Sequence, residues 1–249
     1  MLKLLLGMLL LFNLNVNYNP VIYLVGDSTM ANKPVEDNPE RGWGQLFPLF
    51  FDEGVTIENN AKNGRSTKNF IREGLWQNVL DKLKPGDYVF IQFGHNDQKI
   101  SDTNRYAEAH TTYRQNLIRY VAETREKGAN PVLLTPVNRR KFDKDGKFID
   151  QHEDYPSVVR SVATEMEVPL IDLHKKSEKV FSELGEEKTK ELFLWIPPNK
   201  YKSLPNGKTD NTHFSSEGAI LIASLVVEGM KEIALPISKY LKQKPALGN

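Results

Sequence analysis

Four short polar segments of this sequence contain the side chains that a hydrolytic site requires. They are Gly26-Asp27-Ser28, Asn63-Gly64-Arg65, Gly94-His95-Asn96-Asp97 and Asp210-Asn211-Thr212-His213. A serine hydroxyl becomes a nucleophile when a histidine takes its proton, and a carboxylate can hold that histidine in the productive tautomer. Amide and backbone N–H groups can bind a developing oxyanion. The four segments therefore indicate hydrolysis, provided that the fold brings them together.

The apolar pattern predicts how these segments are positioned. Apolar runs alternate with helical patterns, which is typical of a parallel sheet covered by helices on both faces. Strands are expected at residues 21–25, 55–59, 88–93, 131–135 and 168–173, and helices at 42–51, from about 68, and at 106–126, 155–166, 174–194 and 217–233. Parallel strands all end at one edge, so the first three segments should meet there. The fourth is expected in a loop that follows the Pro- and Gly-rich loop 195–207.

Local signals predict where two of the helices begin. Ser66 or Thr67 could cap the helix that starts near residue 68, and Ser215 or Ser216 could cap the last helix. No repeat or linker interrupts the pattern, so one domain is expected.

Each segment also has a structural interpretation. Gly26-Asp27-Ser28 occurs in many ordinary turns, and Asn96 with Asp97 can form an Asx turn at a strand end. Asp27 can organise the loop around Ser28 through backbone hydrogen bonds. For His95, substrate contact, hydrogen bonding within its loop and simple packing are all open. Three histidines outside the segments are interpreted as structural or surface residues: His110, His152 and His174.

Taken in order, the four segments resemble the four sequence blocks of the SGNH, or GDSL-type, hydrolases. Within that superfamily the chain most resembles the rhamnogalacturonan acetylesterases. The resemblance extends from about residue 20 to residue 230 and rests on the stretches Val25–Ala31, Gly42-Trp43-Gly44, Asn63–Thr67, Phe93–Asp97 and Asp210–Phe214. It implies a three-layer α/β/α, flavodoxin-like fold with a central parallel sheet of about five strands. The better-known fungal members rely on disulfides, whereas this chain has no cysteine.

The resemblance implies a role for each of five residues. Ser28 is the expected nucleophile, forming an acyl-enzyme that water hydrolyses, and His213 is the expected base. Asp210 would orient the imidazole of His213 and stabilise its charged form. The oxyanion hole would consist of the backbone N–H groups of Ser28 and Gly64 and the side-chain amide of Asn96. Glycine suits position 64 because a Cβ would keep the backbone away from the substrate.

Residues around the site would select the ester. Arg65 and Lys68 place positive charge next to the glycine of the second segment, which suits a polymer bearing uronate carboxylates. Arg41, Trp43 and Trp195 could add sugar-stacking and carboxylate-binding groups, although aromatic residues at such positions often belong to the core.

The function implied by the resemblance is that of a serine esterase acting on a plant cell-wall polysaccharide. It would remove acetyl groups from acetylated rhamnogalacturonan, a component of pectin. The nearest alternative is an acetylxylan esterase or a broad-specificity SGNH carbohydrate esterase. An alternative of another class is a catalytically silent carbohydrate-binding domain, which would lack the nucleophile or the base; this chain has both. A lipase is disfavoured because no long apolar lid segment lies near the four segments.

Composition disfavours several other classes of protein. The 249 residues include 33 Lys and Arg against 32 Asp and Glu, so no overall field attracts nucleic acid. The absence of cysteine removes disulfides, thiolate metal sites and a cysteine nucleophile. The histidines and carboxylates show no metal-ligand spacing, so we expect neither a metal nor another cofactor. The sequence leaves the oligomeric state open.

Residues 1–19 have the pattern of an export signal. Lys3 precedes the apolar run Leu4–Phe12, which is too short to span a membrane but suits the core of a signal peptide. No small-x-small cleavage pair follows this run, and a buried N-terminal helix or strand is the alternative. We therefore expect a leader at 1–19, one domain at 20–249, and a secreted or periplasmic protein that is free of the membrane after cleavage.

Overall fold

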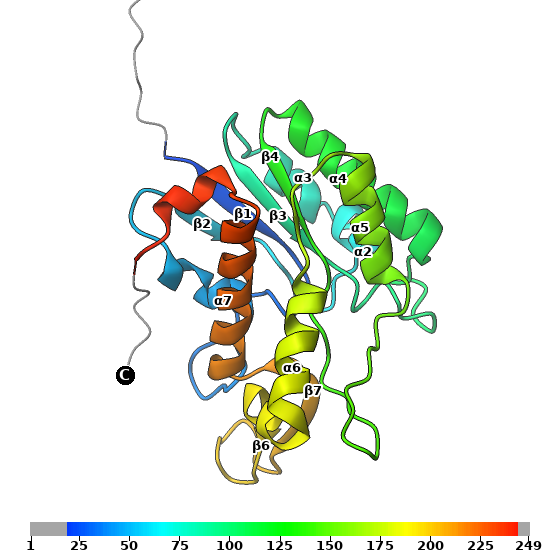
Figure 1. Ribbon diagram of the computed structural model, residues 1–249, viewed down its shortest axis with the longest axis vertical. Helices are drawn as coiled ribbons and strands as arrows, with labels where there is room; N and C mark the ends of the chain where they lie inside the picture. The colour runs from blue at the N-terminus through cyan, green and yellow to red at the C-terminus, as the bar shows by residue number, and fades with distance from the viewer. Residues whose placement is uncertain (1–18, 244–249) are drawn as a thin grey trace, which may run out of the picture.

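The fold is built on a sheet of five parallel strands. The computed structural model of the protein describes residues 19–243. The strands lie in the order β2-β1-β3-β4-β5 (Figure 1). Their bounds are β1 Val21–Gly26, β2 Thr56–Asn59, β3 Tyr88–Gln92, β4 Asn130–Leu134 and β5 Leu170–Ile171. Neighbouring strands of this sheet are parallel, so they all end at the same edge.

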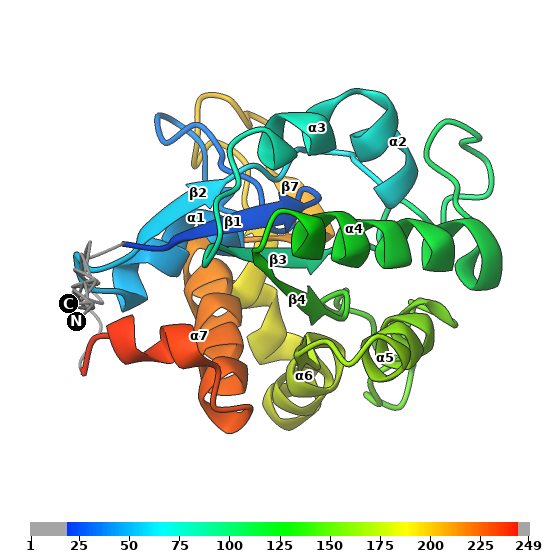
Figure 2. The ribbon, with the colours of Figure 1, turned by 90° about the horizontal axis from the view of Figure 1, so that it is seen from above.

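Helices cover both faces of the sheet (Figure 2). One face packs against α1 Trp43–Leu46, α6 Leu173–Thr189 and α7 Ser216–Glu232. The other packs against α2 Thr67–Arg72, α3 Leu75–Leu80, α4 Arg114–Glu126 and α5 Tyr155–Glu165. Shorter helical turns span Phe47–Phe50, Ala109–Tyr113, Lys190–Leu192 and Pro236–Tyr240. The predicted three-layer α/β/α fold is confirmed, and the strand order is the flavodoxin-like one.

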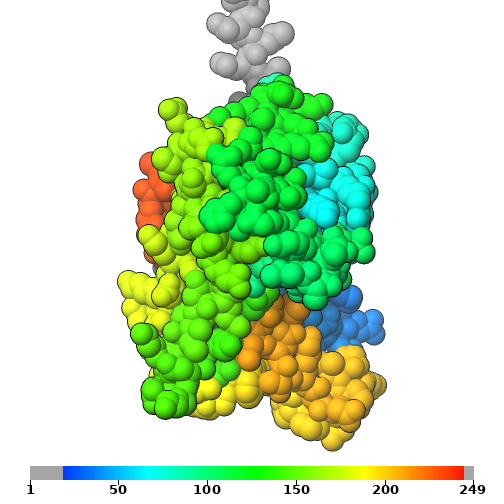
Figure 3. Space-filling view, turned by 90° about the vertical axis from the view of Figure 1, so that its right-hand side faces the viewer, coloured from blue at the N-terminus to red at the C-terminus, as the bar shows by residue number. Residues whose placement is uncertain are grey.

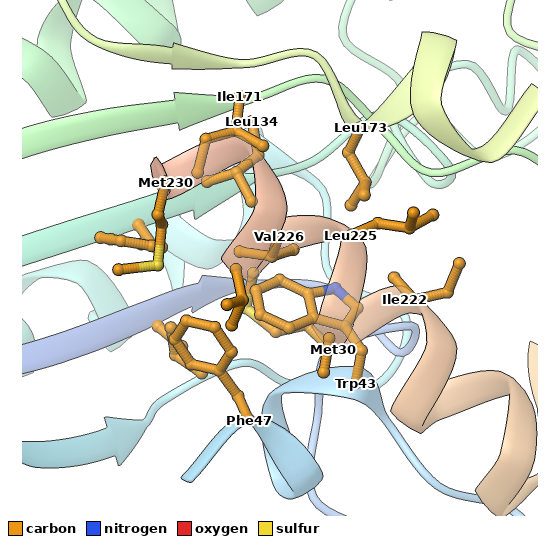
Figure 4. Close-up of a cluster of buried hydrophobic side chains, with 14 of the residues drawn as sticks. Met30, Trp43, Phe47, Leu134, Ile171, Leu173, Ile222, Leu225, Val226 and Met230 are labelled. Atoms are coloured by element: carbon orange, nitrogen blue, oxygen red, sulfur yellow. The ribbon is translucent and has the colours of Figure 1, made fainter. Parts of the chain in front are cut away.

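The core lies on both faces of the sheet because the central strands are largely apolar. Along β1, Ile22 and Leu24 join the cluster beneath α7, whereas Tyr23 and Val25 join the cluster beneath α2–α5. Successive side chains of a strand point to opposite faces, so a strand covered on both sides needs apolar residues at every position. Figure 4 shows the α7 cluster, in which Trp43 is one of the largest side chains.

Two serines fix helix starts. Oγ of Ser66 accepts the N–H of Asn69 at 3.3 Å, and Oδ1 of Asn69 accepts the N–H of Ser66 at 2.6 Å, which forms a capping box at the start of α2. Oγ of Ser215 accepts the N–H of Gly218 at 3.1 Å at the start of α7. Both caps were among the residues predicted from the sequence. Each such cap stabilises its helix by about 1 kcal/mol.

A second, two-stranded antiparallel sheet was missed by the sequence analysis. It pairs β6 Phe193–Ile196 with β7 Lys208–Phe214. The sequence predicted helix to residue 194, a loop at 195–207 and a loop through 208–216; the helix instead ends at Thr189. Most positions of β7 are half-buried and polar, so the alternation that reveals a strand is absent. The fourth polar segment therefore lies on a strand rather than in a loop.

Two other predicted elements are shorter than expected. The helix predicted from residue 106 begins at Ala109, because the side chain of Glu108 caps a short π-helical turn that leads into α4. The strand predicted at 168–173 is limited to β5, because Asp172 caps α6 by accepting the N–H of Lys175. Capping side chains thus set both boundaries.

The expected export signal lies outside the described residues, apart from Asn19. Within residues 19–243, no helix is both long enough and apolar enough to cross a membrane.

Candidate active site

Ser28, His213 and Asp210 form one hydrogen-bonded row at the end of β1. Nε2 of His213 lies 2.9 Å from Oγ of Ser28, and Nδ1 lies 2.8 Å from Oδ2 of Asp210. When Asp210 is ionised, Nδ1 carries a proton and donates it to the carboxylate. Nε2 is then an acceptor for the hydroxyl proton of Ser28. The three residues, predicted from two of the four segments, are thus brought together.

Local contacts keep Asp210 ionised. Its Oδ1 accepts the backbone N–H of Thr212 at 2.8 Å and that of His213 at 3.0 Å, and its Oδ2 lies 3.2 Å from Nζ of Lys208. Burial alone would raise the pKa of Asp210, but the hydrogen bonds and charge of His213 and the N–H of Thr212 bring this pKa well below its usual range. The carboxylate can therefore orient the imidazole at any ordinary pH.

Arg140 holds β7 against the main body of the protein. Its backbone N–H and its Nη1 donate to the two oxygens of Asn211, at 2.8 and 3.2 Å, and Nε1 of Trp195 donates to the side-chain oxygen at 2.8 Å. The rest of its guanidinium donates to Thr189 and Glu186. Figure 3 shows the orange surface of the β7 region directly below the green surface of earlier segments. The hairpin is thus tied to the chain that follows β4.

A second aspartate–histidine pair lies next to Ser28. Oδ2 of Asp27 is 3.2 Å from Nδ1 of His95, and Oδ1 accepts the N–H and the hydroxyl of Thr29 at 2.9 and 2.8 Å. Burial lowers the pKa of His95, and the nearby Asp27 only partly offsets this, so the ring is neutral near pH 7. These contacts confirm the prediction that Asp27 organises the loop. His95, from the loop after β3, bonds to Asp27 of this loop and lines the cavity beside Ser28.

Trp43 supports the loop that carries Ser28 from the core rather than stacking on a sugar. Its side chain is fully buried, and Nε1 donates to Oε1 of Gln92 at 2.9 Å (Figure 4 shows the indole among core side chains). Nε2 of Gln92 in turn donates to the hydroxyl of Thr29 at 2.9 Å. A Cβ on the neighbouring Gly42 would collide with the carbonyl oxygen of Ala31, so the chain packs too closely there for any other residue. The expected substrate contact of Trp43 is therefore wrong.

Three unused donors gather at one cavity. Gly64 and Asn96 line it together with Ser28. Within residues 19–243, the backbone N–H groups of Ser28 and Gly64 donate to no protein acceptor. Nδ2 of Asn96 donates one hydrogen to the carbonyl oxygen of Arg65 at 3.0 Å and retains a second. Gly64 has φ = +74°, a conformation that favours glycine. This arrangement can bind an oxyanion.

Asp97 connects the loop of Asn96 to the start of α2. Its Oδ1 accepts the N–H and the hydroxyl of Thr67 at 2.9 and 2.6 Å, whereas its Oδ2 is buried and has no partner among the described residues. Burial raises the pKa of Asp97 to about 7, although the bonds from Thr67 oppose the change. Asp97 therefore acts on the site through its neighbours.

The cavity beside Ser28 has a volume of about 660 Å³, a size suited to a small ligand or a few sugar units. Its charged lining residues are Lys33, Glu40, Lys99, Arg105 and Arg139. Sequence reasoning named none of them. One signal was available for Arg139, because residues 138–140 follow the fourth predicted strand and so belong to the same sheet edge.

The two cations predicted beside Gly64 do not line this cavity. Nη2 of Arg65 pairs with Glu73 at 2.8 Å, and Nζ of Lys68 donates to the carbonyl oxygen of Thr103 at 2.9 Å. Both residues are close to Gly64 in the sequence, but the side chains of Arg65, which precedes α2, and of Lys68, which lies in α2, turn to other partners.

Arg41 and Trp195 are also absent from the cavity lining. Arg41 is tied to its own loop, where Nη1 donates to the carbonyl oxygens of Asn38 and Glu40 at 2.7 and 2.6 Å. The ring of Trp195 contacts Arg140 and Lys190, each with its charged group 4.7 Å from the ring. Arg41 therefore stabilises its own loop and Trp195 the hairpin of β6 and β7, and neither forms a wall of the site.

The geometry can perform acyl transfer, and sequence comparison agrees. The model of the GDSL-like lipase/acylhydrolase family matches residues 24–219, a span that contains all four polar segments. The chain belongs to this family. As a GDSL-like acylhydrolase, it is a carboxylic ester hydrolase. Within residues 19–243, no group of three or more His, Cys, Asp or Glu side chains is arranged to hold a metal ion.

Relatives of this GDSL-like hydrolase include named carbohydrate esterases. It is 43% identical over 220 residues to the rhamnogalacturonan acetylesterase RhgT of Bacillus subtilis, which covers 88% of this chain and 93% of RhgT. It is 27% identical to the rhamnogalacturonan acetylesterase of Emericella nidulans over 84% of each chain.

Solved structures share the fold. The crystal structure of the Bacillus subtilis protein YxiM superposes with a TM-score of 0.74 at 27% identity, covering 88% of this chain and 58% of that one. A catalytic mutant of the acetylxylan esterase Axe2 from Geobacillus stearothermophilus gives a TM-score of 0.59 at 16% identity, covering 85% and 94%. At that identity the second likeness concerns the fold alone.

Proposed function

We propose that this protein is a serine acetylesterase that removes acetyl groups from acetylated rhamnogalacturonan. The observation that carries the proposal is the row Ser28–His213–Asp210, which opens on a cavity with three unused N–H donors. The likeness to RhgT, which is 43% identical over most of both chains, supports this choice of substrate. Plant cell-wall pectin would be the source of such a polymer.

The contacts define the first half of the reaction. Oγ of Ser28 attacks the acetyl carbonyl carbon while its proton passes to Nε2 of His213, 2.9 Å away. The carbonyl oxygen becomes an oxyanion and accepts the N–H groups of Ser28, Gly64 and Asn96. As the C–O bond to the sugar breaks, His213 returns the proton to the departing sugar oxygen. An acetyl ester on Ser28 and a free sugar hydroxyl remain.

Water completes the cycle. His213 takes a proton from a water molecule, whose oxygen attacks the acetyl carbon in the same oxyanion hole. The bond to Oγ then breaks, the proton returns to Ser28 and acetate leaves. Throughout, the ionised Asp210 stabilises the transient imidazolium.

The alternatives have weaker support. The acetylxylan esterase Axe2 shares only the fold at 16% identity, so it does not favour xylan over pectin. A silent carbohydrate-binding domain would not require the connected serine, histidine and aspartate. We include export in the proposal, because residues 1–19 have the pattern of a signal peptide and a cell-wall polymer lies outside the producing cell.

Acetate release from acetylated rhamnogalacturonan and from acetylated xylan, measured side by side, tests the proposal. The expected result is release from the pectic polymer, with at least tenfold slower release from xylan and none by Ser28→Ala. Faster release from xylan would overturn the substrate but retain the nucleophile. Equal activity of Ser28→Ala would overturn the mechanism.

A further inference from the structure

The cavity beside Ser28 carries more positive charge than its own acid can neutralise. Its cationic lining residues are Lys33, Lys99, Arg105 and Arg139, and its acidic lining residue is Glu40. Glu40 is already occupied, because its two oxygens lie 2.6 Å from Nζ of Lys33 and 3.6 Å from Nζ of Lys208. Glu40 therefore does not neutralise the other three cations.

Arg139 is a half-buried cation that forms no ion pair within residues 19–243. Its Nη2 donates to the carbonyl oxygen of His95 at 3.0 Å, which fixes the guanidinium beside the residue that precedes Asn96. Burial lowers the pKa of Arg139, and the charge of Asp27 opposes this only in part, because the two residues form no direct ion pair. An anion in the cavity would supply that missing partner.

Lys99 approaches the same space from the loop that carries Asn96. Its backbone N–H donates to the carbonyl oxygen of Asn96 at 3.2 Å, and its ammonium group pairs with no carboxylate of the described chain. Burial lowers the pKa of Lys99 and the charges of Arg105 and Arg139 lower it further, whereas the charges of Asp102 and Asp27 oppose the change. Like charges held close together repel one another, and this repulsion would be relieved by an anion between them.

Arg105 forms the border between these cations and the oxyanion donors. Its Nε pairs with Asp102 at 3.0 Å. The central carbon of its guanidinium lies only 3.6 Å from the position that a Cβ would take on Gly64. The positive region therefore reaches the oxyanion hole itself.

We propose that Lys99 and Arg139, bordered by Arg105, form a carboxylate-binding subsite that holds a uronate of the polysaccharide beside the acetylated sugar. A guanidinium can bind a carboxylate with two parallel hydrogen bonds, and the ammonium adds a second positive charge. The inference rests on the proposed function and assigns its preference for an acidic polymer to these residues instead of Arg65 and Lys68.

The test compares an acidic polymer with a small neutral ester. The double variant Lys99→Gln/Arg139→Gln should lower kcat/KM for acetylated rhamnogalacturonan, relative to kcat/KM for p-nitrophenyl acetate, by about 10–100-fold, mainly by raising KM. The matched control is Arg119→Gln, an arginine of α4 that pairs with Glu123 away from the cavity and should leave this ratio unchanged. A ratio that stays constant in the double variant would overturn the subsite.

Neutralising the substrate provides the reciprocal experiment. Methyl esterification of the uronate carboxylates of the same acetylated polymer should lower kcat/KM of the native enzyme by about tenfold or more and that of the double variant by less than threefold. Equal losses of kcat/KM in the two enzymes would contradict the proposal. If Lys99 and Arg139 had only a structural role, their replacement would not change how kcat/KM depends on the charge of the polymer.

An inhibition experiment separates this inference from the proposed function. Oligogalacturonate should inhibit hydrolysis of p-nitrophenyl acetate by the native enzyme and at least tenfold more weakly in the double variant, with neutral xylo-oligosaccharides of equal length as the control. If rhamnogalacturonan released no acetate, this result would still support an acidic-sugar subsite. Equal inhibition constants in both enzymes would overturn it.

Discussion

Two aspartate–histidine pairs flank Ser28, one on each side of the site, and they differ in burial and in what the histidine reaches. Asp210 and His213 lie on β7 with 17% and 28% of their side chains exposed, whereas Asp27 and His95 are 0% and 3% exposed. Both histidines point Nδ1 at a carboxylate, at 2.8 and 3.2 Å. Only His213 has its Nε2 on the hydroxyl of Ser28; Nε2 of His95 has no partner among the described residues.

This difference shows that a carboxylate beside a histidine does not by itself define a catalytic pair. The atom that Nε2 meets decides the role. The half-buried pair places Nε2 of His213 against a hydroxyl that can give up its proton. The buried pair holds a neutral ring in a fixed position, which suits it to support the nucleophile loop.

The largest expected effect comes from His213→Ala. Without a base, the hydroxyl of Ser28 is not activated, and kcat for p-nitrophenyl acetate should fall by about 10⁴–10⁶. Thermal unfolding should change little, because the side chain is only half-buried. A loss of less than about tenfold would mean that another group, with His95 as the nearest candidate, serves as the base.

Asp210→Asn should lower kcat by about 10⁴. The new amide would donate to Nδ1 of His213, so the proton of the imidazole would reside on Nε2. A protonated Nε2 cannot accept the proton of Ser28. The matched control is Asp27→Asn in the buried pair, for which kcat should fall less than tenfold. Steady-state kinetics of both variants make the comparison, and equal losses would remove the distinction between the two pairs.

Asn96→Ala tests the role of Asn96 separately from that of its neighbour His95, which lies in the same loop. It removes one oxyanion donor, so kcat should fall by about 10²–10³ while KM changes little. Circular dichroism should show an intact fold. An unchanged kcat would remove Asn96 from the oxyanion hole and leave the backbone donors alone.

His95→Ala should act mainly on stability. It leaves Oδ2 of the buried Asp27 carboxylate without its donor, whereas Oδ1 keeps its two bonds from Thr29, so the free energy of unfolding should fall by about 1–3 kcal/mol. The kcat of the folded fraction should fall less than tenfold. Urea unfolding and active-site titration measure the two effects; a kcat as low as that of His213→Ala, with normal stability, would give His95 a chemical role.

The smallest effect on activity is expected for Asp97→Asn. This variant tests the buried carboxyl group of Asp97 through the pH dependence of the free energy of unfolding. The pKa of Asp97 is about 7 in the folded protein against 3.8 ordinarily, so the folded state binds the proton more tightly. Its contribution to stability is therefore fully present below pH 3.8 and is lost as the pH rises toward 7. Relative to the native protein, the variant should gain about 1–4 kcal/mol of unfolding free energy between pH 4 and pH 7. Urea unfolding at several pH values measures this difference, and a difference independent of pH would contradict the raised pKa.

The sequence predicted the part of the site at the end of the parallel sheet better than the part on the hairpin of β6 and β7. Strands β1 and β3 are buried on both faces and apolar apart from Gln92 at the end of β3, and Ser28 and Asn96 lie in the loops that follow them. Strand β7 had no comparable signal, since polar side chains occupy most of it and its partner β6 lies beyond a Pro-rich connection. Its residues could be recognised by their types and spacing but not by their secondary structure.

Side-chain direction was the other limit. Arg65 and Lys68 are near Gly64 in the sequence, yet they pair with Glu73 and the Thr103 carbonyl. Arg139, which lines the cavity, is distant in the sequence and reaches it through the end of β4. Which way a long cationic side chain turns depends on tertiary partners, which a single sequence does not reveal.

The three tryptophans of the chain offer separate spectroscopic reporters of these regions. Each indole N–H donates to a different acceptor: Trp43 to Gln92 beneath the nucleophile loop, Trp76 to Glu123 between two outer helices, and Trp195 to Asn211 on the hairpin. In a ¹⁵N-labelled sample their three side-chain resonances would monitor the core, the helical layer and the hairpin independently. A ligand entering beside Ser28 could then be followed by nuclear magnetic resonance without any added label.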